Sequence, residues 1–142
     1  VTLYPYALFD QSAIFEFYCD NQMPMASSLT NRAKKEGRSF SRVQVESKLL
    51  GDYIDRPIDF LKLDIEGSES SVISSVESKL FLVASGIIEY HHGSNNNSLQ
   101  TLLNVLERCG YKYVIKEPFF MKHTTGLKKI TPRWSSSIFF KI

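Results

Sequence analysis

The sequence DFLKLDIEGSE occupies residues 59–69 and is the most informative stretch of the chain. It contains most of a short, largely apolar run over residues 58–65, which Pro57 precedes and Gly67 follows. A run of this length between a proline and a glycine is typical of a strand that is buried in a sheet. We therefore expect a strand over residues 58–65, with Asp64 at its carboxyl end.

The rest of the second half alternates between helix and strand patterns. Apolar side chains recur at helical spacing within residues 68–79 and again within 99–109, so two helices are expected there. Further strands are expected over residues 86–90, 111–115 and 136–142. Strands that alternate with helices build right-handed βαβ units, so the expected class is α/β with a mostly parallel sheet. The last strand follows no crossover helix, and we expect it to be antiparallel to its neighbour.

The first half is less regular. Strands are expected over residues 1–7, 14–18 and 43–46, and a short helix over 49–54. Residues 19–42 are expected to form a loop with five basic residues, which is either a solvated surface or a lid over an anionic ligand. Residues 117–134 are expected to form a second loop, whose aromatic side chains either line an acceptor pocket or pack on the sheet.

Length and composition exclude several classes of protein. The 142 residues suit one domain, and 43% hydrophobic and 23% charged residues are ordinary globular values. A net charge of +2 is too small to indicate a nucleic-acid partner. No apolar run approaches the ~18 residues of a membrane span, and no signal-peptide pattern is present. The two cysteines, Cys19 and Cys109, can remain free thiols, so we expect a cytoplasmic protein that binds neither nucleic acid nor membrane.

Asp64 is the first candidate site residue. In open α/β sheets, ligands bind beyond the carboxyl ends of the strands, where a carboxylate is desolvated unless something contacts it. A ligand with hydroxyl groups, an amine or a positive charge would suit Asp64, and the structural alternative is an acid that caps the next helix. Glu66 and Glu69 are more typical of acids in the first turn of a helix, and Gly67 of a turn between strand and helix.

Glu89 and His91 form the second candidate pair. Side chains alternate along an extended segment, so Glu89 and His91 share one face and His92 points away from it. A glutamate–histidine pair at the end of a strand can bind an acceptor hydroxyl or position a base. The same pair could bind a metal, but no third ligand is spaced near it in the sequence, so no metal is expected.

Several of these segments resemble the FkbM-type methyltransferases. DFLKLDIEGSE at 59–69 is similar to the family signature DhhKhDhEGxE, in which h is apolar. IIEYH at 87–91, GYKY at 110–113 and VTLYPYALFD at 1–10 resemble further family segments. The resemblance implies part of a Rossmann-like class I methyltransferase sheet with an antiparallel last strand. It also implies S-adenosylmethionine as the methyl donor and O-methylation of a hydroxyl on a sugar or natural product.

The resemblance also implies roles for individual residues. Four positions would contact the methyl donor: Ala7, Asp64, Glu66 and Gly67. Of these, Ala7 would lie in part of the adenine pocket, and Asp64 would lie near the methionyl part of the donor or near the acceptor. Glu89 or His91 would orient or deprotonate the acceptor hydroxyl.

The family has a glycine-rich donor loop, whereas no two glycines of this chain are separated by a single residue. The resemblance therefore implies that residues 1–142 are the C-terminal portion of a larger catalytic domain. The expected partner is a small-molecule or glycan acceptor, and the exposed edge of a partial sheet would favour pairing between copies of the chain. The alternatives are an inactive remnant or interaction domain without donor binding, a nucleotide-sugar enzyme, and a metalloenzyme that uses Glu89 and His91.

Overall fold

The computed structural model describes residues 1–20, 40–92, 98–116 and 135–142. The loop expected over 117–134 lies outside these residues, and only the two ends of the loop expected over 19–42 lie inside them. Both ends are strand, because the neighbouring strands extend to Asp20 and begin at Phe40. Among the helices of the described ranges, none has the length and apolar character needed to cross a membrane.

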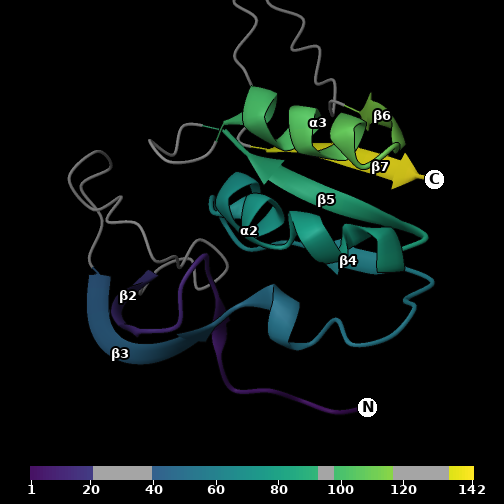
Figure 1. Ribbon diagram of the computed structural model, residues 1–142. Coiled ribbons are helices and arrows are strands. Elements are labelled where there is room, and N and C mark those ends of the chain that lie inside the picture. The colour runs from purple at the N-terminus through teal and green to yellow at the C-terminus, as the bar shows by residue number, and fades with distance from the viewer. Residues whose placement is uncertain (21–39, 93–97, 117–134) are drawn as a thin grey trace, which may run out of the picture.

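The first of two sheets comes from the N-terminal part of the chain. It contains β1 (Ala7–Leu8), β2 (Ile14–Asp20) and β3 (Phe40–Lys48), with β3 in the middle. β2 runs antiparallel to β3 (Figure 1). β1 runs parallel to β3. The buried hydroxyl of Ser47 on β3 holds the turn between β1 and β2. It donates to the Gln11 carbonyl (2.6 Å) and accepts from the Ala13 N–H (3.1 Å).

The second sheet packs against the core, and its strands include those whose carboxyl ends precede the candidate site residues. It contains β4 (Leu61–Leu63), β5 (Ser85–His91), β7 (Ser135–Lys141) and β6 (Lys112–Lys116), in that spatial order. β4 and β5 are parallel, and β7 is antiparallel to both β5 and β6. The expected α/β class and the antiparallel last strand are therefore confirmed.

The expectation of a mostly parallel sheet is wrong. Of the paired neighbours, β4–β5 and β1–β3 are parallel, while β2–β3, β5–β7 and β6–β7 are antiparallel. The reason is the place of the last strand: β7 lies between β5 and β6, so these two strands point the same way but do not pair. A strand without a crossover helix can enter the middle of the sheet, and the sequence pattern does not reveal its position.

Two expected strands are shorter than the sequence predicts. The strand expected over 1–7 is limited to β1, since Pro5 has no N–H to donate to a ladder. The strand expected over 58–65 is β4, preceded by an isolated bridge between Ile58 and Val83. The helix expected over 49–54 is the short 3₁₀ helix η2 (Leu50–Asp52).

Helices lie between the strands of the second sheet. The helix expected over 68–79 is divided into α2 (Glu69–Ser75) and the 3₁₀ helix η3 (Glu77–Leu82). At the junction, Ser75 Oγ donates to the Val72 carbonyl (2.8 Å), a local bond that competes with the helix ladder. The helix expected over 99–109 is confirmed as α3 (Leu99–Arg108), capped where Ser98 Oγ accepts from the Thr101 N–H (3.2 Å).

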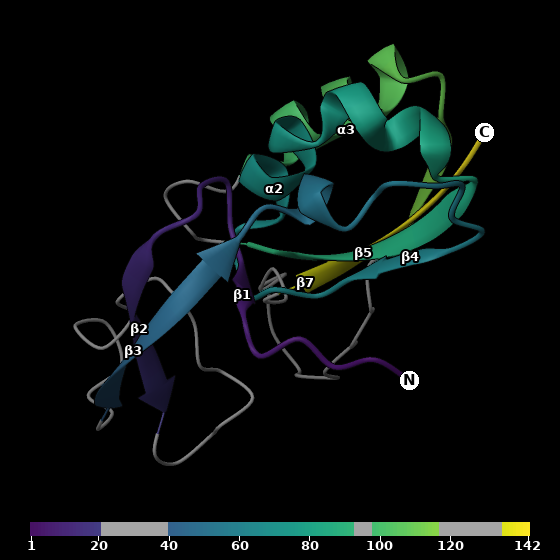
Figure 2. The ribbon, with the colours of Figure 1, turned by 60° about the horizontal axis from the view of Figure 1, so that its bottom comes forward.

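The core lies between these helices and the sheet. Figure 2 shows α2 and α3 on the same side of the strands β4, β5 and β7. The buried apolar residues of the strands and helices form one cluster, which includes Leu63, Ile73, Ile88, Leu106 and Ile138. This packing fixes β4 and β5 against each other and thereby sets the positions of their carboxyl ends.

Gly86 allows β4 and β5 to pair closely. A Cβ atom at Gly86 would overlap the Leu61 carbonyl oxygen and lie 2.5 Å from Phe140 Cζ, and backbone cannot yield as a flexible side chain does. We expect Gly86→Ala to lower the free energy of unfolding by about 2 kcal/mol or more. Gly51→Ala is the matched control, because its Cβ would meet only side-chain atoms at 3.7 Å or more, and it should change stability by less than about 1 kcal/mol. Urea unfolding measures both, and equal effects would contradict the prediction.

Tyr111 makes stability depend on pH at the alkaline end. Its buried hydroxyl lies against the carbonyls of Leu80 and Val83, and burial, with a smaller effect of Cys109, raises the pKa of Tyr111 to about 12. Below pH 10, Tyr111→Phe should lower the free energy of unfolding by about 1–3 kcal/mol, because the two buried carbonyls lose the single O–H donor that they share. Above pH 10 the unfolded chain loses the proton while the folded chain keeps it, so this difference should shrink as the pH approaches 12.

Urea unfolding of the wild type and of Tyr111→Phe at about pH 8 and about pH 11 checks this sign. A stability difference that stays constant or grows toward high pH would contradict it.

Candidate functional site

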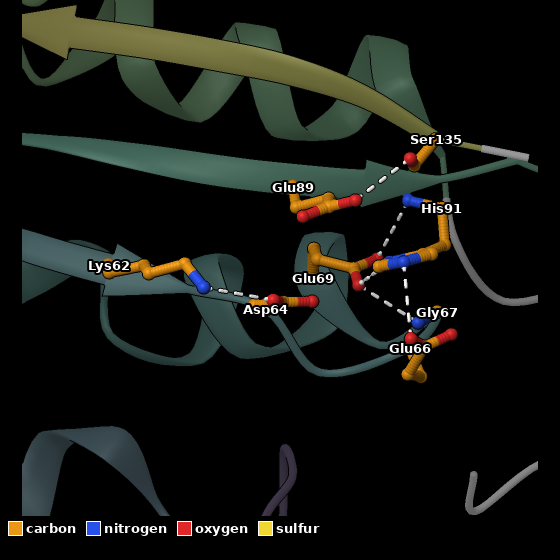
Figure 3. A network of polar contacts seen from close by, with 8 residues as sticks. All are labelled: Lys62, Asp64, Glu66, Gly67, Glu69, Glu89, His91 and Ser135. Atoms are coloured by element: carbon orange, nitrogen blue, oxygen red, sulfur yellow. Dashed lines mark hydrogen bonds and ion pairs between the residues drawn. The ribbon is translucent and has the colours of Figure 1, made fainter. Parts of the chain in front are cut away.

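The candidate site lies at the carboxyl ends of β4 and β5, which are parallel neighbours in the sheet. Asp64 directly follows β4, and His91 is the last residue of β5. Glu66 and Gly67 lie in the turn that leads to α2, whose first residue is Glu69. Figure 3 shows these side chains converging at one edge of the sheet.

Glu69 is the most deeply buried of these groups, with 0% of its surface exposed. Its Oε1 accepts a hydrogen bond from the Gly67 N–H (2.9 Å) and lies 2.8 Å from His91 Nδ1. Its Oε2 accepts a longer bond from the backbone N–H of His91 (3.5 Å). One carboxylate therefore holds both the turn after β4 and the end of β5.

The turn between β4 and α2 has two consecutive residues with positive φ. Gly67 has a φ of 107°, and Glu66 has a φ of 56°, which is uncommon for a residue with a side chain. This backbone turns the chain sharply and places Glu66 Oε1 3.5 Å from His91 Nε2. The imidazole of His91 thus lies between two carboxylates, one at each ring nitrogen.

The surroundings of His91 act on its pKa in opposite directions. Burial of the ring lowers the pKa, whereas the hydrogen bond to Glu69 and the charges of Glu69, Glu66 and Glu89 raise it. The net pKa of His91 lies above its ordinary value. The site therefore stabilises an imidazolium, which is the form that a histidine base adopts after accepting a proton.

Asp64 lies at the more exposed side of the cluster. Lys62 Nζ donates to Asp64 Oδ2 (3.0 Å), and this contact raises the pKa of Lys62. The ligand atoms of Asp64, Glu66 and His91 all lie within 4.8 Å of one another. The structure thus brings together three residues that the sequence assigned to two separate candidate clusters.

Glu89 and His92 make their hydrogen bonds to β7. Ser135 Oγ donates to Glu89 Oε1 (2.9 Å), so this acid is tied to the last strand. The His92 ring pairs with Ser136 Oγ (2.7 Å) and packs edge-on against Tyr90, in agreement with the prediction that it points away from His91. Ala7 lies on β1, beside Ser47 in the other sheet, and is not part of the cluster.

The role of Glu69 was missed at the level of sequence, where it reads as an acid in the first turn of a helix. It does occupy that turn, but its carboxylate faces inward. A signal existed: Glu69 stands three and four residues before Val72 and Ile73, which are both fully buried. An acid at that spacing lies on the buried face of the helix and requires buried donors.

The effect of Glu69 on His91 can be tested by substitution. We expect Glu69→Gln to lower the pKa of His91, because the amide keeps a hydrogen-bonding oxygen but removes the negative charge. Glu89→Gln is the control, since Glu89 acts on His91 only through its charge and should shift the pKa less. An NMR titration of the imidazole ring protons measures the pKa of His91 in both variants. A Glu69→Gln shift that is upward, or no larger than the Glu89→Gln shift, would contradict the prediction.

Comparison with known proteins supplies a family. Residues 2–113 match the model of the FkbM methyltransferase domain, a range that includes Asp64, Glu66, Glu69 and His91. Among curated proteins and among solved structures, no match was found. Since the matched range spans most of the 142 residues, the chain belongs to the FkbM methyltransferase domain family.

Proposed function

We propose that this methyltransferase transfers a methyl group from S-adenosylmethionine to a hydroxyl oxygen of a sugar or natural-product acceptor. The observation that carries the proposal is the Glu66–His91–Glu69 arrangement at the carboxyl ends of β4 and β5, within a chain of this family. Ligands of α/β proteins bind at such strand ends.

The strand order supports a Rossmann-like sheet as the scaffold of this activity. β4, β5 and β6 all point the same way, and β7 enters between β5 and β6 in the opposite direction. We propose that these strands are the later strands of a class I methyltransferase sheet. The free thiols of Cys19 and Cys109 support a reducing compartment, and we place the protein in the cytoplasm.

In the proposed reaction, the acceptor oxygen forms a bond to the methyl carbon while the bond from that carbon to the sulfonium sulfur breaks. S-adenosylmethionine, when bound, supplies this electrophilic methyl group. His91 Nε2 accepts the proton of the hydroxyl, and Glu69 at Nδ1 stabilises the resulting imidazolium. Asp64 and Glu66 bind hydroxyl groups of the acceptor or the ammonium group of the donor, and so orient the reacting atoms.

A binding and transfer experiment tests the function. Calorimetry of the chain with S-adenosylmethionine should give saturable heat, and radiolabelled donor should label hydroxyl-bearing acceptors. Absence of donor binding would favour the alternative of an interaction domain. A preference for nucleotide sugars over S-adenosylmethionine would favour the nucleotide-sugar enzyme.

Substitution at Asp64 tests the site. Asp64 is partly exposed, so Asp64→Ala should fold normally and lower the rate of methyl transfer at least about tenfold. Asp55→Ala is the control, because this aspartate is exposed, pairs with Arg56 and precedes β4 in the chain. Equal transfer rates in the two variants would contradict the assignment of the site.

A further inference from the structure

The geometry at the ends of β4 and β5 points to a binding site for a divalent transition-metal ion, with Asp64, Glu66 and His91 as ligands. Their ligand atoms lie within 4.8 Å of one another. Ligands about 2.1 Å from one ion are roughly 3 Å apart when adjacent and about 4.2 Å apart when opposite. The observed spacing needs only small side-chain movements to match these values. This inference differs from the sequence-based expectation that the protein has no metal.

The sequence pointed to Glu89 and His91 as the metal pair and offered no third ligand. The structure gives a different set, because Glu89 receives its hydrogen bond from Ser135 on β7. The turn after β4 instead brings Glu66 Oε1 to 3.5 Å from His91 Nε2, and Asp64 completes the group. The three ligands come from two strand ends and were not recognisable as a set along the chain.

The orientation of His91 is the observation that favours a metal site over a cluster of acidic side chains that binds no ion. A metal-binding histidine commonly donates its second ring N–H to a carboxylate, which fixes the ring and makes the ligating nitrogen more basic. Glu69 Oε1 lies 2.8 Å from His91 Nδ1 and is itself held by the Gly67 N–H. Nε2 of His91 is thereby directed toward Glu66, and the ring is buried, with 8% of its side chain exposed.

The ligand chemistry selects the class of ion. Two carboxylates and one imidazole give two hard oxygen donors and one nitrogen donor, a set that suits Mn²⁺ and Zn²⁺ better than Mg²⁺ or Ca²⁺. Three protein ligands leave coordination positions for water or for a ligand oxygen. At the edge of the cluster, the Asp64 side chain is 34% exposed, which gives the ion a route from solvent.

Manganese titration of the whole chain tests the site. After treatment with EDTA and desalting, the protein is titrated with Mn²⁺ alone, without donor or acceptor, and free Mn²⁺ is followed by electron paramagnetic resonance. We expect one ion per chain with a Kd below about 0.1 mM. Pulsed measurements on the bound ion should detect a directly coordinated imidazole nitrogen.

Three variants make the result decisive. Asp64→Asn and His91→Gln should each weaken binding at least tenfold, and His91→Gln should lose the nitrogen signal. Asp64→Asn removes a partly exposed charge, so it is informative even where His91→Gln fails to fold. Asp55→Asn changes an exposed aspartate that pairs with Arg56 outside the cluster, and it should bind as the wild type does.

Two results would overturn the site: no saturable Mn²⁺ binding, or binding that Asp64→Asn leaves unchanged. Because donor and acceptor are absent from this experiment, either result would leave the proposed methyl transfer to be judged by its own assay. Loss of methyl transfer would likewise leave the metal measurement intact.

Discussion

The buried carboxylate of Glu69 is the interaction on which the site depends. A carboxylate removed from water is strongly destabilising unless donors surround it, and Glu69 finds them in the Gly67 N–H and in His91. These bonds link the turn after β4 to the end of β5. The pairing of β4 with β5 also requires that residue 86 has no side chain, which glycine provides. The packing of the sheet and the geometry of the site therefore depend on the same strand pair.

The proposed base and the proposed metal ligand are the same atom. His91 Nε2 can hold a proton or a metal ion, but not both. In the proposed reaction of the metal-free chain, His91 Nε2 would accept the proton of the acceptor hydroxyl. A bound ion would instead lower the pKa of a coordinated hydroxyl, and its proton would then pass to water. Glu69 serves both states, since it stabilises an imidazolium in the first and orients a ligating imidazole in the second.

Several features were predictable because they rest on local physics. The apolar spacing and the Ser98 cap define α3, and the apolar run between Pro57 and Gly67 locates β4. The turn at Glu66 and Gly67 follows from the glycine, whose φ of 107° is costly for other residues. The lengths of the elements were less predictable. The serine-rich helix α2 ends early, because the Ser75 hydroxyl donates a hydrogen bond to the Val72 carbonyl.

Local patterns along the chain were enough to indicate the α/β class, the family and the presence of acids and a histidine at two strand ends. Three features became visible only in the folded chain: β7 lies between β5 and β6, Glu89 bonds to Ser135, and Glu69 and Glu66 enclose His91. The reason is that periodicity reports which face of an element is buried. The partner of a buried carboxylate is set by strand order and by the path of a turn, which join residues 22 positions apart.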